Sequence, residues 1–156
     1  MPLSIVLAIV IQNNKILLIK RKKGQFTNLL AIPGGKIEKN EHLKSASKRE
    51  LKEEAQINAD FEEYLGCVSE ILIENNEVKA NFILHLCKLK PKTNKILNSD
   101  EGDVNWYNLS SLNSIKDQII PSDFKMIENF VLNKTKNYFD CIEEKIGDKY
   151  YLKKFT

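Results

Sequence analysis

Apolar residues in the first part of the chain form short runs that are separated by turn residues. Two β-branched runs, at 4–11 and 16–19, flank Asn13-Asn14, a pair that tolerates the positive φ angles of a tight hairpin turn. A shorter apolar run at 28–32 stops at a Pro-Gly-Gly sequence. The pattern predicts a β-hairpin followed by a short strand and a turn.

The rest of the chain predicts two helices among further strands. Pro121 opens a stretch with apolar residues at helical spacing, and Gly147-Asp148 provides a turn for a last hairpin. The predicted elements are a helix over 41–56, a hairpin of strands 62–74 and 77–89, a strand over 104–109, a helical turn over 110–115, a helix over 121–139 and a hairpin over 141–155. We therefore expect an α/β or α+β fold with a mixed sheet, in a single domain over 1–156.

Composition narrows the class of protein. The 156 residues are 42% hydrophobic and 29% charged, which is typical of a globular chain, and no apolar run reaches the roughly 18 residues of a membrane span. The net charge is +3, but the lysines are scattered and lack interleaved aromatic residues, so we expect a small-molecule partner and no nucleic-acid polymer. Three well-separated cysteines predict reduced thiols in a cytoplasmic protein: Cys67, Cys87 and Cys141.

The helix over 41–56 carries charge in an unusual arrangement. At about 100° per residue, three lysines form a stripe on one face: Lys44, Lys48 and Lys52. Glu50, Glu53 and Glu54 project to the other side, together with the apolar residues that should face the core. Glutamates that served only solubility would lie beside the lysines, so we expect these three to have another role.

Local energetics oppose this glutamate cluster. Glu50 has like charges at i+3 and i+4, and each such pair costs roughly 0.2–0.5 kcal/mol. Only Glu53 has a basic neighbour at helical spacing, Arg49. A divalent cation such as Mg²⁺ or Mn²⁺ would compensate the charge, since both prefer carboxylate oxygens. The Gly34-Gly35 pair just upstream would let the backbone approach a metal or a phosphate.

The order of these residues matches a family signature. The signature is Gly, five residues, Glu, seven residues, Arg-Glu, an aliphatic residue, any residue, Glu-Glu, any residue, Gly and an aliphatic residue. The chain supplies it over 35–57 as Gly35, Glu41, Arg49-Glu50, Leu51, Glu53-Glu54 and Ile57. It resembles the Nudix (MutT-like) hydrolases, with one departure, because Gln56 stands where the family has glycine. A glycine there would close the helix in a left-handed conformation, and Asn58 is an alternative residue at which the helix could end.

The resemblance implies an α/β/α sandwich and metal-dependent cleavage of a diphosphate, with Mg²⁺ or Mn²⁺ as cofactor. It implies that Glu50, Glu53 and Glu54 hold the metal, that the Gly34 carbonyl adds a ligand, and that Arg49 and Glu41 brace the carboxylates. The residue that orients or deprotonates the attacking water is either Glu50 or an acid of a later loop. Within 98–106 the best later candidate is Glu101, which an ordinary acidic turn explains equally well, and Glu101 could also join the metal.

Substrate contacts are implied for a few residues outside the helix. Arg21, at the end of the second strand, is similar to a phosphate-contacting arginine, although a solvated strand end is an equal alternative. Gly35 would lie beside the phosphates, and Ile32 is similar to residues that line a base pocket. Asp123 stands where some MutT-like members contact a purine, but Asp123 or Ser122 also suits the N-cap of the predicted helix, which is the favoured interpretation.

Three functions stay open. The leading prediction is a pyrophosphohydrolase acting on a nucleoside triphosphate or a related nucleoside diphosphate derivative, including oxidised purine nucleotides. The alternatives are an ADP-ribose or nucleotide-sugar diphosphatase, which the absence of proline in 62–74 disfavours, and a non-catalytic domain that senses a nucleotide. The sequence does not decide the oligomeric state, and a homodimer is compatible with it.

Overall fold

A curved mixed sheet forms the centre of the molecule. The computed structural model describes residues 1–156, and its strands follow the order β3-β2-β1-β6-β5-β8-β9, with β4 added to β1 and β7 added to β2. Pairing is parallel between β1 and β6 and between β5 and β8, and antiparallel elsewhere. The strands are β1 Leu3–Gln12, β2 Lys15–Arg21, β3 Leu30–Ala31, β4 Gly34–Lys36, β5 Ala59–Glu74, β6 Glu77–Pro91, β7 Gly102–Asn108, β8 Tyr138–Ile146 and β9 Lys149–Phe155.

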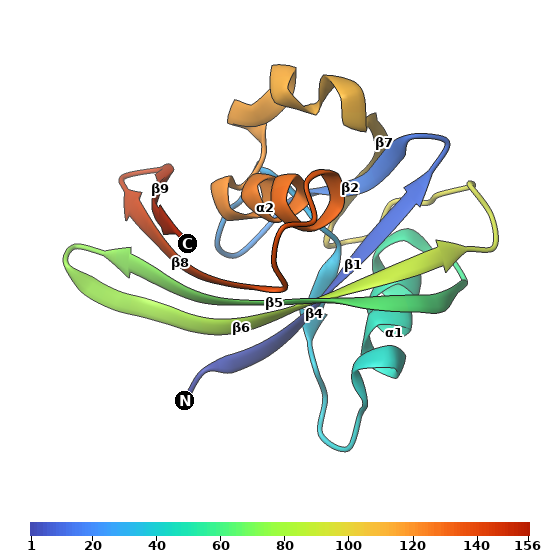
Figure 1. Ribbon diagram of the computed structural model, residues 1–156, viewed down its shortest axis with the longest axis horizontal. Coiled ribbons are helices and arrows are strands. Elements are labelled where there is room, and N and C mark those ends of the chain that lie inside the picture. Colours follow the sequence, from blue (N-terminus) through green and yellow to red (C-terminus); the bar gives the residue numbers. More distant parts are fainter.

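Helices cover the sheet from two sides. In Figure 1, α1 lies below the long strands β5 and β6, and α2 lies above them. The helical elements are α1 Leu43–Ala55, the 3₁₀ segment η1 Leu109–Gln118, α2 Pro121–Met126 and the π-helical turn η2 Ile127–Leu132. This α/β/α arrangement with a mixed sheet confirms the predicted fold.

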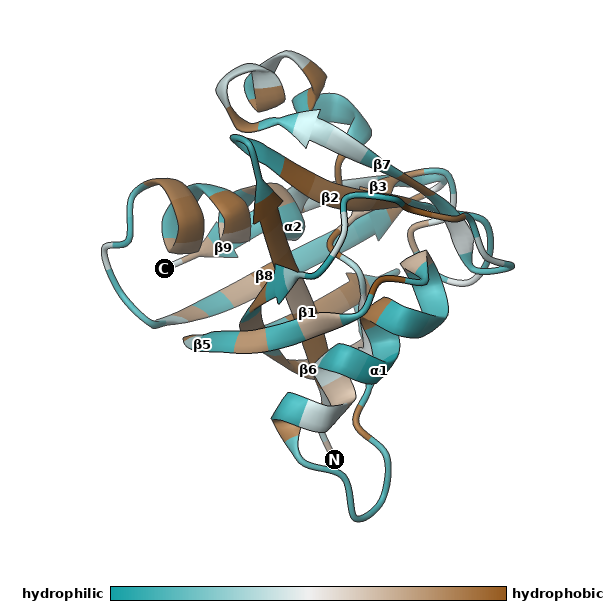
Figure 2. Ribbon diagram, turned by 90° about the vertical axis from the view of Figure 1, so that its right-hand side faces the viewer, coloured by the Kyte–Doolittle hydropathy of each residue, from teal (hydrophilic) through white to brown (hydrophobic).

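Apolar side chains fill the space on both sides of the sheet. One cluster lies on the α2 side and includes Ile9, Ile16, Leu86 and Phe130, and a second lies around Leu51 of α1. Figure 2 shows the hydrophobic interior along β1 and β2, while α1 is largely hydrophilic on its outer side. The alternation that predicted the strands therefore places their apolar residues in the core.

The predicted hairpins form at the expected turns. Asn13, Asn14, Asn75 and Asn76 all have positive φ angles, between 52° and 61°, as tight hairpin turns require. The last hairpin joins β8 to β9 at Gly147, whose φ is also positive at 61°. These turns confirm the predictions from Asn-Asn and Gly-Asp pairs.

The second predicted helix is shorter than expected. The prediction of a helix over 121–139 was wrong at its C-terminal end, because the helical segment ends at Leu132 and Tyr138 begins β8. Phe139 pairs with Val68 of β5 and its ring contacts Phe130 at 5.3 Å and Phe155 at 4.7 Å between centroids. Burial of this aromatic residue in the sheet outweighs the helical pattern around it.

The helix α1 confirms most of the predicted faces. Its three lysines are exposed, whereas Glu50 and Glu54 are buried, at 9% and 3% exposure. Gln56 ends the helix with φ 57° and ψ 30°, and its amide donates to the Lys52 carbonyl oxygen. The alternative that Asn58 ends the helix was therefore wrong, because Gln56 adopts the left-handed conformation itself.

Two further sequence predictions concern the cysteines and membrane insertion. All three cysteines are free, with Cys87 and Cys141 buried and Cys67 partly exposed. None of the helices has both the length and the apolar character needed to cross a membrane.

Candidate active site

The Pro33-Gly34-Gly35 segment is fixed against β1 and α1. The Ala8 amide donates to the Pro33 carbonyl oxygen at 2.7 Å, and β4 pairs with β1 from Gly34 onward. A Cβ atom at Gly34 would collide with the backbone oxygen of Val6, and one at Gly35 would lie 2.5 Å from the Glu50 carboxylate. Both glycines are therefore required by close approach, the first to a strand and the second to an acid of α1.

Glu50 and Glu54 form a pair of buried acids beside this segment. The Gly34 amide donates to Glu54 Oε2 at 3.2 Å. Burial, followed by the charges of Glu50 and Glu101, raises the pKa of Glu54 to about 8. Burial also raises the pKa of Glu50, against the opposing effect of Arg49. The hydrogen-bond donors of the protein therefore do not fully stabilise the ionised forms of Glu50 and Glu54.

Arg49 joins the acids that precede and follow it. Its Nε and Nη2 atoms donate to the two carboxylate oxygens of Glu41 at 2.8 and 2.9 Å, and Nη1 donates to Glu50 at 2.7 Å. Its Nη2 also donates to the Lys36 carbonyl oxygen at 3.0 Å. These contacts lower the pKa of Glu41 to about 2, chiefly through the side-chain hydrogen bond from Arg49. Arg49 and Glu41 therefore connect the turn after β4 to α1.

Glu53 differs from its two neighbours. Its side chain is 56% exposed and lies 3.3 Å from Arg49 Nη1, so the prediction that all three glutamates face inward was wrong for Glu53. The interaction with Arg49 at i−4 holds the carboxylate at the rim of the buried pair. Its role as a metal ligand stays a prediction.

Arg21 and Glu101 approach the buried acids from outside α1. The charge of Glu101 raises the pKa of Glu54, and the charge of Arg21 lowers it. Arg21 ends β2, and its Nε donates to the Gln25 carbonyl oxygen at 2.9 Å. Glu101 is exposed, and its carbonyl oxygen accepts from the Lys22 amide at 3.2 Å. The structure therefore brings Arg21 and Glu101, which are far from α1 in the sequence, close enough to Glu54 for their charges to act on it.

Asp123 does not cap its helix. The helix α2 begins at Pro121, and its N-cap residue is Ile120, whose side chain makes no capping hydrogen bond, so the interpretation of Asp123 or Ser122 as the N-cap was wrong. Asp123 Oδ2 instead accepts a hydrogen bond from the Ile32 amide at 2.8 Å. Burial raises the pKa of Asp123 to about 7, the Ile32 amide opposes this effect, and the charge of Glu70 adds to it. Both predicted base-pocket residues, Ile32 and Asp123, are thus buried and in contact with each other.

Two further acids lie buried near Asp123, and the sequence analysis missed them. Glu70 on β5 is 3% exposed and Glu143 on β8 is fully buried. The Ser122 amide donates to Glu143 Oε1 at 2.6 Å, whereas Glu70 Oε2, Glu143 Oε2 and Ser122 Oγ have no hydrogen-bond partner. Period-2 alternation could have revealed both acids, because Glu70 shares its face of β5 with Val68 and Leu72, and Glu143 follows Phe139 and Cys141 on the inward face of β8.

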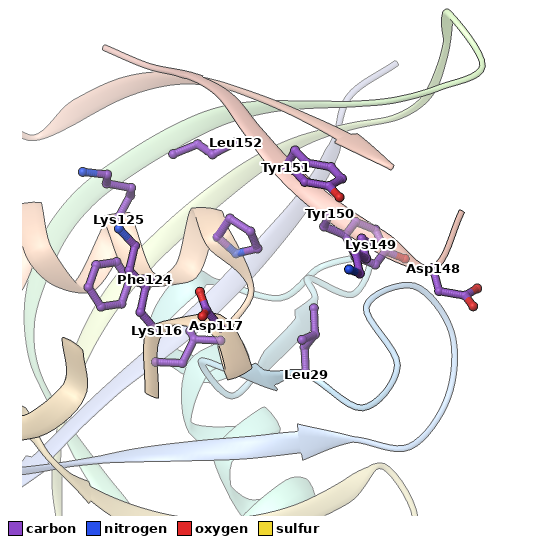
Figure 3. A pocket seen from close by; sticks show the side chains of 12 residues that line it. Leu29, Lys116, Asp117, Phe124, Lys125, Asp148, Lys149, Tyr150, Tyr151 and Leu152 are labelled. Carbon is purple, nitrogen blue, oxygen red and sulfur yellow. The ribbon is translucent and has the colours of Figure 1, made fainter. Parts of the chain in front are cut away.

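A cavity of about 640 Å³ lies between α2, η1 and the C-terminal hairpin. Figure 3 shows the side chains around it, which come from Leu29, from the Lys116–Asp117 region, from Phe124 and from the Asp148–Leu152 turn. None of the predicted metal-binding carboxylates lines this cavity.

The residues around Gly34 fit a divalent cation. No group of three or more histidine, cysteine, aspartate or glutamate side chains is already gathered closely enough to hold a metal. However, Glu50 and Glu54 are buried with raised pKa values, and a cation would reverse the repulsion that raises them. The donor set consists of carboxylate oxygens and backbone carbonyls, which suits Mg²⁺ or Mn²⁺.

A comparison with protein families assigns this chain to a family. The NUDIX domain family matches residues 1–130, which include every element from β1 to α2 and all the acids of α1. The chain belongs to the Nudix family. The signature over 35–57 is therefore a Nudix box, and the helix α1 is the Nudix helix.

Solved Nudix structures share the fold. A MutT protein from Bacillus halodurans is 22% identical with a TM-score of 0.73, and the alignment covers 97% of each chain. A bifunctional NMN adenylyltransferase/ADP-ribose pyrophosphatase from Francisella tularensis, complexed with AMP and a manganese ion, is 26% identical with a TM-score of 0.63, over 81% of this chain and 40% of the other.

Curated relatives match less than half of the chain. An ADP-ribose pyrophosphatase from Methanocaldococcus jannaschii is 41% identical over 68 residues, covering 44% of this chain and 40% of the relative. An 8-oxo-dGTP diphosphatase from Buchnera aphidicola is 39% identical over 66 residues, covering 42% and 51%. The chain therefore spans only about half of each relative, or less. The two relatives carry names of different activities, so they indicate a common chemistry more than a common substrate.

Proposed function

We propose that this Nudix protein is a Mg²⁺-dependent pyrophosphohydrolase that cleaves a nucleoside triphosphate or a related nucleoside diphosphate derivative. The observation that supports it most is the buried pair Glu50 and Glu54, held against Gly34-Gly35 with only one amide donor to Glu54. Such a pair is costly unless a cation or a proton compensates it. Mn²⁺ is the alternative metal.

Each residue of the site has a proposed task. Glu50 and Glu54 would hold the metal, with the Gly34 carbonyl oxygen as a backbone ligand and Glu53 joining from the rim. The bound metal would neutralise phosphate charge and make a water molecule more acidic. Arg49 keeps Glu50 in place through its 2.7 Å hydrogen bond, and Glu41 in turn orients Arg49.

The proton of the attacking water would go to a carboxylate of this chain. Glu50 and Glu101 are the two candidates. Burial raises the pKa of Glu50, but its carboxylate already accepts a hydrogen bond from Arg49 and is assigned to the metal, so its oxygen atoms would be occupied. The Glu101 carboxylate is exposed and has no ion pair, so we favour Glu101 as the general base.

Substrate binding would use the side of the site away from α1. Arg21 would contact a phosphate, because its charge already acts on Glu54 and Asp123. Gly35 leaves the backbone open to the phosphates. Ile32 and Asp123 would border the base or sugar, although both are buried here, so this contact would need the adjoining segment to move.

A second substrate class has a specific observation in its favour. The 41% identity to an ADP-ribose pyrophosphatase extends over 68 residues, about as many as the 66 of the 39% identity to an 8-oxo-dGTP diphosphatase. An ADP-ribose or nucleotide-sugar diphosphatase is therefore the alternative. A non-catalytic nucleotide sensor is the third possibility, but the complete set of box carboxylates does not favour it.

A substrate screen tests the proposed function. The purified protein is incubated with Mg²⁺ and, in separate reactions, with dGTP, 8-oxo-dGTP, ATP and ADP-ribose, and the products are separated by chromatography. Release of pyrophosphate from a triphosphate supports the leading proposal. Release of AMP from ADP-ribose supports the alternative, and tight nucleotide binding without any product supports the sensor.

Substitution of the box acids tests the metal-binding roles. Glu53→Gln and Glu54→Gln should each lower kcat by about 100-fold or more, because loss of metal ligands removes the charge compensation that the reaction needs. The fold should be intact or slightly more stable by thermal unfolding, since each change removes a like charge. Lys48→Gln on the exposed face is the matched control and should retain parent activity. Turnover at the parent rate with saturating Mg²⁺ would show that the assigned roles are wrong.

A further inference from the structure

A series of short contacts leads from the C-terminal hairpin to the Nudix glycines. Glu143 on β8 accepts a hydrogen bond from the Ser122 amide at 2.6 Å. The next residue, Asp123, accepts one from the Ile32 amide at 2.8 Å. Two residues after Ile32, the Gly34 amide donates to Glu54 at 3.2 Å. Each contact joins two elements that are distant in the sequence.

Burial makes the first of these contacts specific. Glu143 is fully buried and Ser122 is 1% exposed, so water cannot readily replace the carboxyl group of Glu143 as acceptor for the Ser122 amide. An unsatisfied buried amide costs far more than an exposed one. No side chain caps α2 from within its own segment. Two contacts from other segments hold the helix start: the Ser122 amide donates to Glu143, and the Ile120 amide donates to the Leu30 carbonyl oxygen at 3.0 Å.

We propose that Glu143 is a positioning residue for the metal-binding segment: by holding the start of α2, it places Asp123 against Ile32 and so fixes the backbone that carries Gly34 and Gly35. Glu143 acts on the site through Asp123 and would contact neither the substrate nor the metal. Glu143 lies beyond residues 1–130, the part that matches the Nudix family. A strand outside the family match therefore completes the support of the Nudix box.

Amide hydrogen exchange tests the positioning role without reference to activity. Glu143→Met keeps the length of the side chain but removes the acceptor, whereas Glu143→Gln keeps an acceptor oxygen. We expect exchange at Ile32 to accelerate by about tenfold in Glu143→Met and to return to the parent rate in Glu143→Gln. Glu144→Gln is the matched control, because Glu144 is the next residue of β8 and pairs with Lys153 at 3.3 Å.

Metal affinity tests the consequence for the site, and this part rests on the proposed function. Mn²⁺ binding without substrate, followed by electron paramagnetic resonance, should weaken by at least about threefold in Glu143→Met and recover in Glu143→Gln. Unchanged Ile32 exchange in Glu143→Met would overturn the positioning role. Faster exchange with unchanged Mn²⁺ affinity would overturn the link to the metal segment. A parent protein that binds no Mn²⁺ would overturn the proposed function, while the exchange result would still decide the positioning role.

The parent protein provides a test if Glu143→Met fails to fold. If Glu143 holds the start of α2, and α2 in turn holds Ile32, the amides of Ser122 and Ile32 should become exposed in the same opening event. Their exchange should then show the same dependence on low concentrations of denaturant. Different dependences would show that the two contacts open independently and would overturn the proposal.

Discussion

Arg49 provides the positive charge that compensates the acidic side chains on one side of the Nudix helix. Its guanidinium group contacts Glu41, Glu50 and Glu53, at distances from 2.7 to 3.3 Å. Helical spacing predicted only the contact with Glu53, because it pairs residues three or four apart, whereas the bracing role of Arg49 and Glu41 was implied by the family resemblance alone. The contact with the preceding turn depends on how the chain folds back, and the one with adjacent Glu50 depends on the reach of a long side chain. Neither is visible in helical spacing.

Gln56 is the clearest single-residue departure from the Nudix signature. It ends α1 with φ 57°, a conformation that costs a non-glycine residue about 1 kcal/mol. Gln56→Gly should therefore raise the free energy of unfolding by up to about 1 kcal/mol, although the greater entropy of glycine in the unfolded chain offsets part of the gain. Chemical denaturation measures it. Gln56→Ala serves as the control, because alanine keeps the strain, and an equal gain in both variants would contradict the explanation.

At the scale of elements, the contact between β4 and α1 decides the geometry of the site. Gly34 approaches the backbone of β1, and Gly35 approaches the carboxylate of Glu50. Backbone cannot move aside without disrupting the strand, whereas the end of a glutamate side chain can rotate. The two glycines, although adjacent, should therefore respond differently to the same substitution.

Gly35→Ala should leave the fold largely intact and impair the site. The new methyl group would displace the Glu50 carboxylate, so we expect a loss of kcat of about 10-fold or more with a change of less than about 1 kcal/mol in unfolding free energy. Gly34→Ala should instead destabilise the protein by about 2 kcal/mol or more, because its methyl group meets the backbone of Val6. Activity assays and thermal unfolding of both variants check this. Equal loss of stability in both would contradict it.

Elements with local signals were predictable, and those set by distant contacts were not. Asn-Asn pairs and alternating apolar residues identified the hairpins, because a turn and its strands lie close together in the sequence. The end of the second helix depended on Phe139 joining the sheet beside Val68. These two residues are far apart in the sequence. The parallel pairing of β5 with β8 is equally non-local.

At the scale of the whole molecule, three elements contribute one buried group of acids. These acids are Glu70 from β5, Asp123 from α2 and Glu143 from β8. On top of the larger effect of burial, the charge of Glu70 raises the pKa of Asp123 and of Glu143, and the charge of Asp123 adds to the rise at Glu143. The sequence gives no sign that these residues meet, since each lies in a different segment and none belongs to the signature. The Nudix box was recognisable because its acids lie at fixed spacing within one helix.

The buried acids make stability depend on pH. Burial and the charge of Glu70 raise the pKa of Glu143 to about 9, from 4.5, so the folded protein keeps a proton that the unfolded chain has lost. The stabilisation is complete below about pH 4.5 and is lost as the pH rises toward the folded value. The free energy of unfolding should therefore fall between pH 5 and 9, by at most about 1.4 kcal/mol per pH unit for this one proton.

Glu143→Gln should flatten this decline. The amide has no proton to lose and retains an oxygen for the Ser122 amide, so the variant should match the parent near pH 5 and exceed it in stability near pH 9. Urea unfolding at a series of pH values measures both curves. Parallel curves for the variant and the parent would show that Glu143 does not titrate in this range.

The parallel pairing of β5 with β8 also has a consequence while the chain is being synthesised. Residues 67–74 of β5 find their partners in 138–145, so this side of the strand is open until residues 138–145 have also left the ribosome. An open strand invites pairing with other chains, and an inward charge discourages it. Glu70, in contact with water at that stage, would be ionised. The same carboxyl that is costly in the finished protein would protect the nascent one against aggregation.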